Sequence, residues 1–299
     1  MAPITEPSHL LNPLVTSLQL ETSSSQLDGI PKDIEDSTRF ATASLIQAAG
    51  ILLHLPQEII AQAIVVLSRF WVGPDGGSIL DHDAEEVAAA ALYLVAKPSA
   101  FPITPRQTLT TIKYLSSLPL AGLTSLDMST KLGFSDWHLP ESQYEAARNR
   151  LFEIEGHILR VLGFQTHVAL PHTLCINYLQ TIDAFQSSTG SLVAKAAFAH
   201  LNSALLSPQL LYLTHQPSAL AVAAIYLASR EVDVKLPEVE WWEVFDVDRE
   251  ELGFLVVAFR SIAGFALKEQ GKWSERKAPM TVVEVRAEVE RYRTRGLGD

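Results

Sequence analysis

Residues that often carry chemistry are present in this 299-residue chain, but their spacing gives no catalytic motif. Glu153 and Glu155 lie two apart on a predicted helix and therefore point in different directions, which argues against an acid–base pair. The single cysteine, Cys175, cannot form an internal disulfide or a cysteine-type zinc site. The sequence contains no serine elbow, phosphate-binding loop or glycine-rich dinucleotide turn. We therefore expect a protein that is not an enzyme and has no cofactor.

Histidine and tryptophan are the remaining candidates for a site. Four histidines share no metal-binding spacing, so no metal site is expected: His54, His157, His167 and His172. Trp241 and Trp242 are adjacent, and such a pair can form an exposed anchor for a partner protein. More often such a pair covers its own core, because indole rings bury a large apolar area. We keep Trp241 and Trp242 as a candidate partner surface.

The composition is that of a globular protein, with 47% hydrophobic and 19% charged residues. The formal net charge of -11 opposes general affinity for phosphate backbones, so direct binding of nucleic acid is not expected. The amino terminus shows no basic region followed by an apolar core, and no later run is apolar enough to span a bilayer. These features predict a soluble intracellular protein without a membrane partner.

Helical periodicity dominates the first half of the chain after Ser37. Predicted helices cover residues 37–53, 57–71, 83–97, a stretch that begins at 104, and 141–162. Asp83 with Glu86, and Thr104 with Gln107, have the spacing of capping boxes. The helix over 83–97 is apolar on nearly every side, which predicts that it lies at the centre of a bundle.

The second half repeats this plan. The segment AALYLVAK at 90–97 reappears as AAIYLASR at 223–230, and each copy ends in a cation. Unless this match is a coincidence between alanine-rich helices, it predicts two similar bundles. The second would contain helices over 171–185, 191–206, 239–245 and 248–267, the last capped by Asp248 with Glu251.

The two ends of the chain differ from the predicted helical bundles in composition and pattern. Residues 1–36 are rich in Ser, Thr and Pro, and their apolar stretch from Leu10 to Leu20 is compatible with one packed helix or with a disordered tail. Near the carboxyl end, Thr281 and Glu284 could cap an amphipathic helix that continues to Arg293. That helix could pack on a bundle, bind a partner or remain solvated.

Three segments, in order, resemble the cyclin family: SLIQAAGILLHLPQEIIAQAIVVLSRFW, the AALYLVAK helix, and FEIEGHILRVLGFQTHVALPHTLCINYL. The resemblance covers Ser37 to Leu267 and is strongest in the transcription-type branch. The opening helix is similar to cyclin L, and LPEVEWWEVF is similar to the Trp-rich segment of cyclins L, Q, K and T. It implies an all-α fold of two tandem five-helix cyclin boxes, at 37–166 and 167–270, with extensions at 1–36 and 271–299.

The resemblance also implies a function. A cyclin is a regulatory subunit that binds a cyclin-dependent kinase and favours its active arrangement, here in transcription or RNA processing and in the nucleus. Lys97 and Glu155 match the lysine and glutamate with which the family binds the kinase. Each has another explanation: Lys97 complements a helix dipole, and Glu155 could be a solvated position.

One departure from the family pattern limits this inference. After Lys97, where many cyclins carry an apolar residue and two acids, the chain reads Pro98, Ser99, Ala100, Phe101, Pro102. The two prolines make this loop rigid and uncharged. A cyclin-fold scaffold that does not activate a kinase is therefore an alternative. A transcription adaptor similar in role to transcription factor IIB is another, although such a DNA-bridging protein should be basic.

Overall fold

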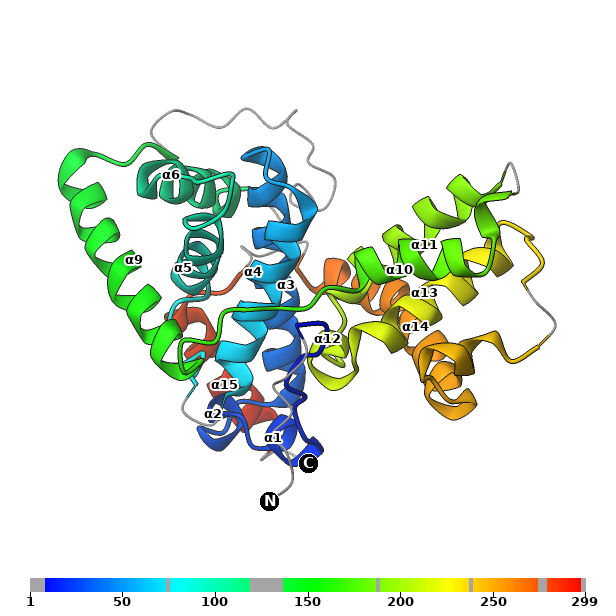
Figure 1. Ribbon diagram of the computed structural model, residues 1–299. Coiled ribbons are helices and arrows are strands. Elements are labelled where there is room, and N and C mark those ends of the chain that lie inside the picture. Colours follow the sequence, from blue (N-terminus) through cyan, green and yellow to red (C-terminus); the bar gives the residue numbers. More distant parts are fainter. Residues whose placement is uncertain are drawn as a thin grey trace, which may run out of the picture. The chain divides into compact units, whose positions relative to one another are not determined.

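The computed structural model describes residues 9–73, 76–118, 137–186, 189–236, 239–273 and 279–296 (Figure 1). Every regular element in these ranges is a helix and none is a strand, which confirms the predicted all-α class. In the same ranges, no helix combines the length and the apolar character needed to cross a bilayer.

The described residues divide into two compact units. The larger unit lies within 16–167 and 266–299, and the smaller unit lies within 1–15 and 168–265. The division after His167 falls next to the predicted junction between the two boxes. The predicted boundaries of the boxes and their extensions nevertheless remain predictions.

The larger unit is built around one central helix, α5. Its helices are α1 (Ser17–Glu21), α2 (Ser24–Leu27), α3 (Lys32–Leu52), α4 (Gln57–Val72), α5 (Ala84–Ala96), α6 (Pro105–Ser116), α9 (Glu141–Val161), the end of α14 (Arg249–Trp273), and α15 (Val282–Gly296). Helix α5 packs against α3, α4, α6 and α9 (Figure 1). All its residues except Glu85 and Glu86 are buried, because its alanines allow neighbouring helices to approach on every side.

The smaller unit repeats this arrangement around α13. Its elements are α10 (Pro171–Thr181), the 3₁₀ turn η1 (Ala184–Gln186), α11 (Gly190–Ala204), α12 (Leu211–Thr214), α13 (Pro217–Glu231), the 3₁₀ turn η2 (Trp241–Phe245), and α14 up to Phe265. Helix α13 packs against α10, α11, α12 and η2. The two copies of the repeated segment are therefore the buried central helices of two bundles, as predicted.

Three of the four predicted caps are confirmed. Thr104 forms a full capping box, Thr281 exchanges hydrogen bonds with Glu284, and the Asp248 carboxylate accepts from the Glu251 N–H at 2.7 Å. The capping box predicted at Asp83 is wrong. Asp83 is the N-cap of α5, but its carboxylate accepts from the Val282 N–H at 2.8 Å and makes no side-chain bond to α5.

The amino-terminal segment is not a single helix from Leu10 to Leu20. Residues 11–16 are not helical and α1 begins only at Ser17, since Pro13 disfavours helix in the residue before it. In the smaller unit, the Asn12 side chain donates to the Ala169 carbonyl at 2.8 Å and accepts from the Ala169 N–H at 2.9 Å. The segment is thus fixed by specific backbone contacts.

The loop between α4 and α5 is held by residues from both ends of the chain. Ser24 donates to the Gly76 carbonyl at 2.9 Å, and the Ile79 N–H donates to the Ser25 hydroxyl at 3.1 Å. From α15, Arg286 donates to the Leu80 carbonyl at 3.0 Å. These bonds fix the loop that carries His82 in the larger unit.

Candidate functional site

Lys97 and Glu155, which are 58 residues apart, meet at the end of the central helix of the larger unit. Helix α5 ends at Ala96, and Lys97 is its C-cap. The Lys97 ammonium donates directly to Oε1 of Glu155 on α9. Glu155 is only 6% exposed, whereas the Lys97 side chain is 49% exposed. The structure therefore brings these two predicted site residues together, with the anion fixed in the protein and the cation at its surface.

An aromatic ring lies beside the Lys97 end of this ion pair. The Lys97 ammonium lies 5.3 Å from the centre of the Tyr93 ring, and that ring lies 6.0 Å from Phe152. Phe152 and, in the following loop, Phe101 are exposed. Exposed aromatic rings beside a fixed charge are typical of surfaces that bind proteins. Sequence spacing alone did not indicate Tyr93 or Phe152.

The loop after Lys97 is a short series of turns. The Ser99 N–H donates to the Ala96 carbonyl at 3.1 Å, and the Phe101 N–H donates to the Ser99 hydroxyl at 3.0 Å. The loop contributes no charged side chain between Lys97 and Thr104. The loop that follows Lys97 is consequently uncharged where many cyclins carry acids.

The two tryptophans do not lie in equivalent places. Trp241 is 3% exposed and packs within the smaller unit, with its ring centre 6.2 Å from that of Phe245. Phe245 stacks on Tyr178 at 3.8 Å between ring centres. Trp242 is partly exposed, although its indole N–H is buried and has no partner among the described residues. These positions favour the interpretation in which Trp241 covers its own core, and only Trp242 is left for a partner surface.

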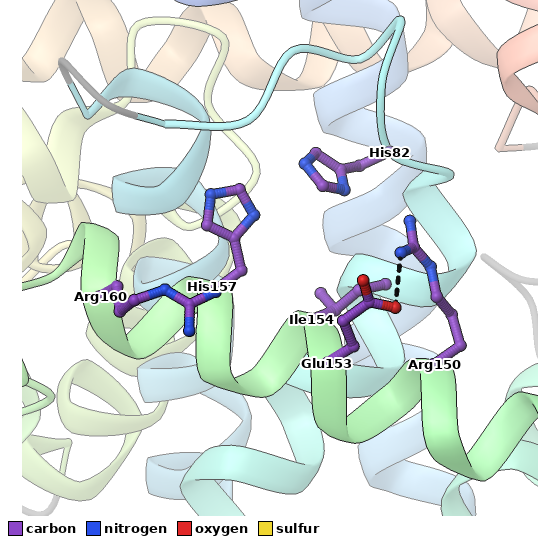
Figure 2. Close-up of a pocket in the computed structure, with 6 residues that line it drawn as sticks. All are labelled: His82, Arg150, Glu153, Ile154, His157 and Arg160. Atoms are coloured by element: carbon purple, nitrogen blue, oxygen red, sulfur yellow. Dashed lines mark hydrogen bonds and ion pairs between the residues drawn. The ribbon is translucent and has the colours of Figure 1, made fainter.

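A second cluster, which sequence reasoning missed, lines a pocket between α9 and the loop before α5 (Figure 2). Arg150 pairs with Glu86 through Nε at 3.1 Å and with Glu153 through Nη1 at 2.9 Å. These hydrogen bonds to Glu153 and Glu86 raise the pKa of Arg150. The His82 and His157 ring centres are 5.0 Å apart. No local motif could have indicated this cluster, because His82 lies on a loop whose course depends on both ends of the chain.

The described residues include no group of three or more His, Cys, Asp or Glu side chains placed to hold a metal ion. Cys175 is buried in α10, and burial raises the pKa of its thiol to about 12. A thiol with so high a pKa is a poor nucleophile, so Cys175 acts as a small core residue.

No family model matches the chain. Cyclin-L1-1 of Arabidopsis thaliana is 31% identical over 239 residues, which cover 78% of this chain and 52% of that protein. Cyclin-L1 of Danio rerio is 28% identical over 242 residues, which cover 81% and 45%. Cyclin-L2 of Homo sapiens is 28% identical over 244 residues, which cover 81% and 43%. The chain thus spans about half the length of the curated relatives it matches.

Solved structures give the same fold. A chain of the yeast RNA Pol II CTD kinase CTDK-1 complex matches 95% of this chain and 84% of its own length, with a TM-score of 0.61 and 14% identity. A chain of the CAK complex of Chaetomium thermophilum bound to ATP-gamma-S matches 85% and 70%, with a TM-score of 0.52 and 16% identity. At such identities these matches establish the fold alone.

Two bundles built around repeated central helices, together with the matches above, give this chain the cyclin fold. Within that class the sequence matches are to L-type cyclins. The resemblance to the transcription-type cyclins is therefore confirmed.

Proposed function

We propose that the chain is the regulatory subunit of a cyclin-dependent kinase that acts in transcription or RNA processing. The observation that carries the proposal is the ion pair between half-exposed Lys97 and buried Glu155 at the end of α5. These residue types match the kinase-binding pair of the family, and the relatives in sequence are L-type cyclins. Nuclear residence is part of the same proposal.

The proposed mechanism is a shift in population. A rigid surface that binds the active form of the kinase more tightly than the inactive form raises the active fraction by the ratio of the two affinities. The kinase then supplies the residues that bind ATP and transfer phosphate. This chain supplies a cation and a carboxylate on two packed helices, α5 and α9, together with the exposed rings of Phe101 and Phe152. No catalytic group of its own is needed.

The rigidity of the site supports this mechanism. Lys97 directly follows a helix that is buried along nearly its whole length, and Glu155 lies between the buried residues Ile154 and Ile158 on α9. Helices α5 and α9 pack directly on each other. Because neither side chain depends on a mobile segment for its position, little ordering is required when a partner binds.

A tagged full-length chain tests the proposal by co-purification from cell extract, with mass spectrometry of the partners and a kinase assay on the beads. We expect the wild type to bring down an active kinase. The double variant Lys97→Ala, Glu155→Ala should lose most of it. Arg230→Ala is the matched control, because Arg230 in the last turn of α13 matches Lys97 in the repeated segment and has no ion pair among the described residues. This control should retain the kinase.

The other outcomes decide between alternatives. A kinase that binds but stays inactive would support a non-activating scaffold, which the uncharged loop from Pro98 to Pro102 favours. Absence of any kinase from the wild-type sample would refute the proposal. In that case the partners that do appear would test the role of a transcription adaptor.

A further inference from the structure

The pocket in the larger unit is a cavity of about 130 Å³ on the side of α9 that faces the loop before α5. Its lining consists of His82, Arg150, Glu153, Ile154, His157 and Arg160. Figure 2 shows His82 above the helix and the other five along one face of α9. The cavity has room for several water molecules, each of which occupies about 30 Å³ of liquid.

Most nitrogen atoms in this pocket lack a protein partner. Nδ1 of His82 is buried and makes no hydrogen bond. In the described part of the chain, the His157 ring and the Arg160 guanidinium also form no hydrogen bond or ion pair, although His157 packs edge-on against Phe70 with ring centres 5.3 Å apart. Three donor-bearing side chains therefore line a space in which no protein group accepts from them. Arg160 is exposed and His157 is half-buried, so water can solvate them, whereas the buried Nδ1 of His82 is an unusual unpaired group.

The immediate lining is positive in a chain whose net charge is -11. Arg150 and Arg160 face a single lining carboxylate, Glu153, whose interaction with Arg150 is already formed. Burial lowers the pKa of His82, and the positive charge of its neighbours His157 and Arg150 lowers it further, while Asp81 and Glu153 oppose that shift. Glu86, outside the lining, also pairs with Arg150.

We infer that this pocket binds the tetrahedral oxyanion of a phosphate monoester or of free phosphate. Its oxygens accept hydrogen bonds from several directions, which the unpartnered histidine rings and the Arg160 guanidinium supply. A planar carboxylate offers fewer acceptor sites for donors that converge from both α9 and the opposite loop. A metal ion would require further ligands, which the described residues do not place here.

The loop geometry preserves the pocket in the unbound chain. A Cβ at Gly77 would lie 2.6 Å from the Phe70 ring and 2.7 Å from the His82 ring, so glycine is required for this close approach. The adjacent bonds from Ser25 and Arg286 fix the same loop. His82 is thus held opposite α9 before any ligand arrives, which limits the ordering cost of binding.

The inference predicts a direction of pH dependence. A bound dianion stabilises the protonated ring of His82, so binding should raise the pKa of His82, which burial lowers in the unbound chain. Arg150 and Arg160 attract the anion, whereas the carboxylates of Asp81, Glu86 and Glu153 repel it. Affinity for a given phosphate charge state should therefore fall as the pH rises through the titration of His82.

The test is a titration of the full chain without a kinase, by calorimetry and by NMR of the histidine rings. The probes are inorganic phosphate, a blocked phosphothreonine, and the same blocked threonine without phosphate. We expect a Kd on the order of 1 mM or lower for at least one phosphate probe, and none for the unphosphorylated one. Tighter binding of the phosphothreonine would assign the site to a phosphorylated side chain, whereas tighter binding of inorganic phosphate would assign it to the free ion.

Two variants test the location. His157→Gln and Arg160→Gln should each weaken binding by on the order of tenfold, because each removes a charge-assisted hydrogen bond. Arg148→Gln, which removes one positive charge from the same helix outside the pocket, should leave binding nearly unchanged. Circular dichroism of each variant establishes that the fold is retained.

Two results would overturn the inference. The first is a wild-type chain in which the pKa of His82 does not rise when phosphate is added, a measurement that needs no variant. The second is weak phosphate binding with the same Kd in the wild type and in all three variants, which would indicate an adventitious ion only. Because the kinase is absent from these experiments, neither result bears on the proposed regulatory function.

Discussion

The two central helices, α5 and α13, match in their buried positions but differ in the contacts of the cation near their carboxyl ends. Leu92 and Ile225 occupy matching positions, and both are fully buried. Lys97 and Arg230 also match in sequence. Only Lys97, however, reaches a buried glutamate, whereas Arg230 is exposed and has no ion pair within the described ranges.

The neighbouring acid in the smaller unit does not replace that glutamate. Glu231 follows Arg230 directly and pairs with His200 of α11 at 3.0 Å, at the surface. The two central helices therefore share their packing but not the ion pair at the end of the helix. Duplication accounts for the bundle, since buried apolar positions recur. The proposed kinase-binding pair also needs an acid from α9, and among the described residues no acid pairs with Arg230 near the end of α13.

The largest expected effect tests whether the two helices are equivalent in packing. Leu92→Ala and Ile225→Ala each remove a fully buried aliphatic side chain, so each should cost about 2–5 kcal/mol of stability. Denaturant unfolding measures the cost, and hydrogen exchange assigns it to one unit or the other. If either variant cost less than about 1 kcal/mol, the corresponding helix would not be the centre of its bundle.

The packing was predictable from the sequence because it depends on local periodicity. The repeated segments and the caps at Thr104, Asp248 and Thr281 were read correctly from neighbouring residues. The cap at Asp83 was not, since its carboxylate is taken by a backbone N–H 199 residues away. Glu86, its expected partner in the capping box, pairs instead with Arg150 of α9.

The two candidate sites were harder to predict, because each is formed by residues that lie far apart in the sequence. Lys97 and Glu155 were identified by family resemblance, because no local spacing connects residues on two different helices. The pocket at His82 and His157 matches no motif, and its geometry depends on a loop that Ser25 and Arg286 fix from opposite ends of the chain. Chemistry formed by such long-range contacts cannot be read from periodicity.

A second difference between the units is a buried acidic cluster at the start of α3. Among the described residues of the smaller unit, no aspartate or glutamate has its pKa raised as far as Asp36 of this cluster. Glu35 is fully buried and accepts from Ser23, Gln26 and Arg39. Ser37 donates to the buried Glu269. Beside them, burial raises the pKa of Asp36 to about 6, against the attraction of Arg39 and Lys32 and with added repulsion from Glu35 and Glu269.

Asp36→Asn tests this difference. A carboxyl whose folded pKa is raised favours folding at low pH, and it loses that contribution as the pH rises from its unfolded value of 3.8 through about 6. At pH 7 the variant should therefore be more stable than the wild type by about 1–3 kcal/mol, and the difference should vanish below about pH 4. Unfolding measured from pH 4 to pH 8 checks this, and a destabilised variant at pH 7 would contradict it.

The smallest expected effect concerns the ion pair that distinguishes α5 from α13. A double-mutant cycle of Lys97→Ala and Glu155→Ala should give a coupling of about 0.2–1 kcal/mol, because the Lys97 side chain is half exposed and water screens its charge. Arg230→Ala should change stability by less than about 0.5 kcal/mol. The coupling should decrease as salt is added.

The size of this coupling bears directly on the proposed function. If Lys97 and Glu155 both bind backbone groups of a kinase, their mutual interaction must be shared or broken, and the coupling free energy opposes binding by up to that amount. A coupling near 0.5 kcal/mol would reduce affinity by only about twofold, so the pair can orient both groups without preventing their use. A coupling above about 3 kcal/mol would instead indicate a structural pair. Lys97 would then differ from Arg230 in how much it stabilises the fold, and not in how readily it binds a partner.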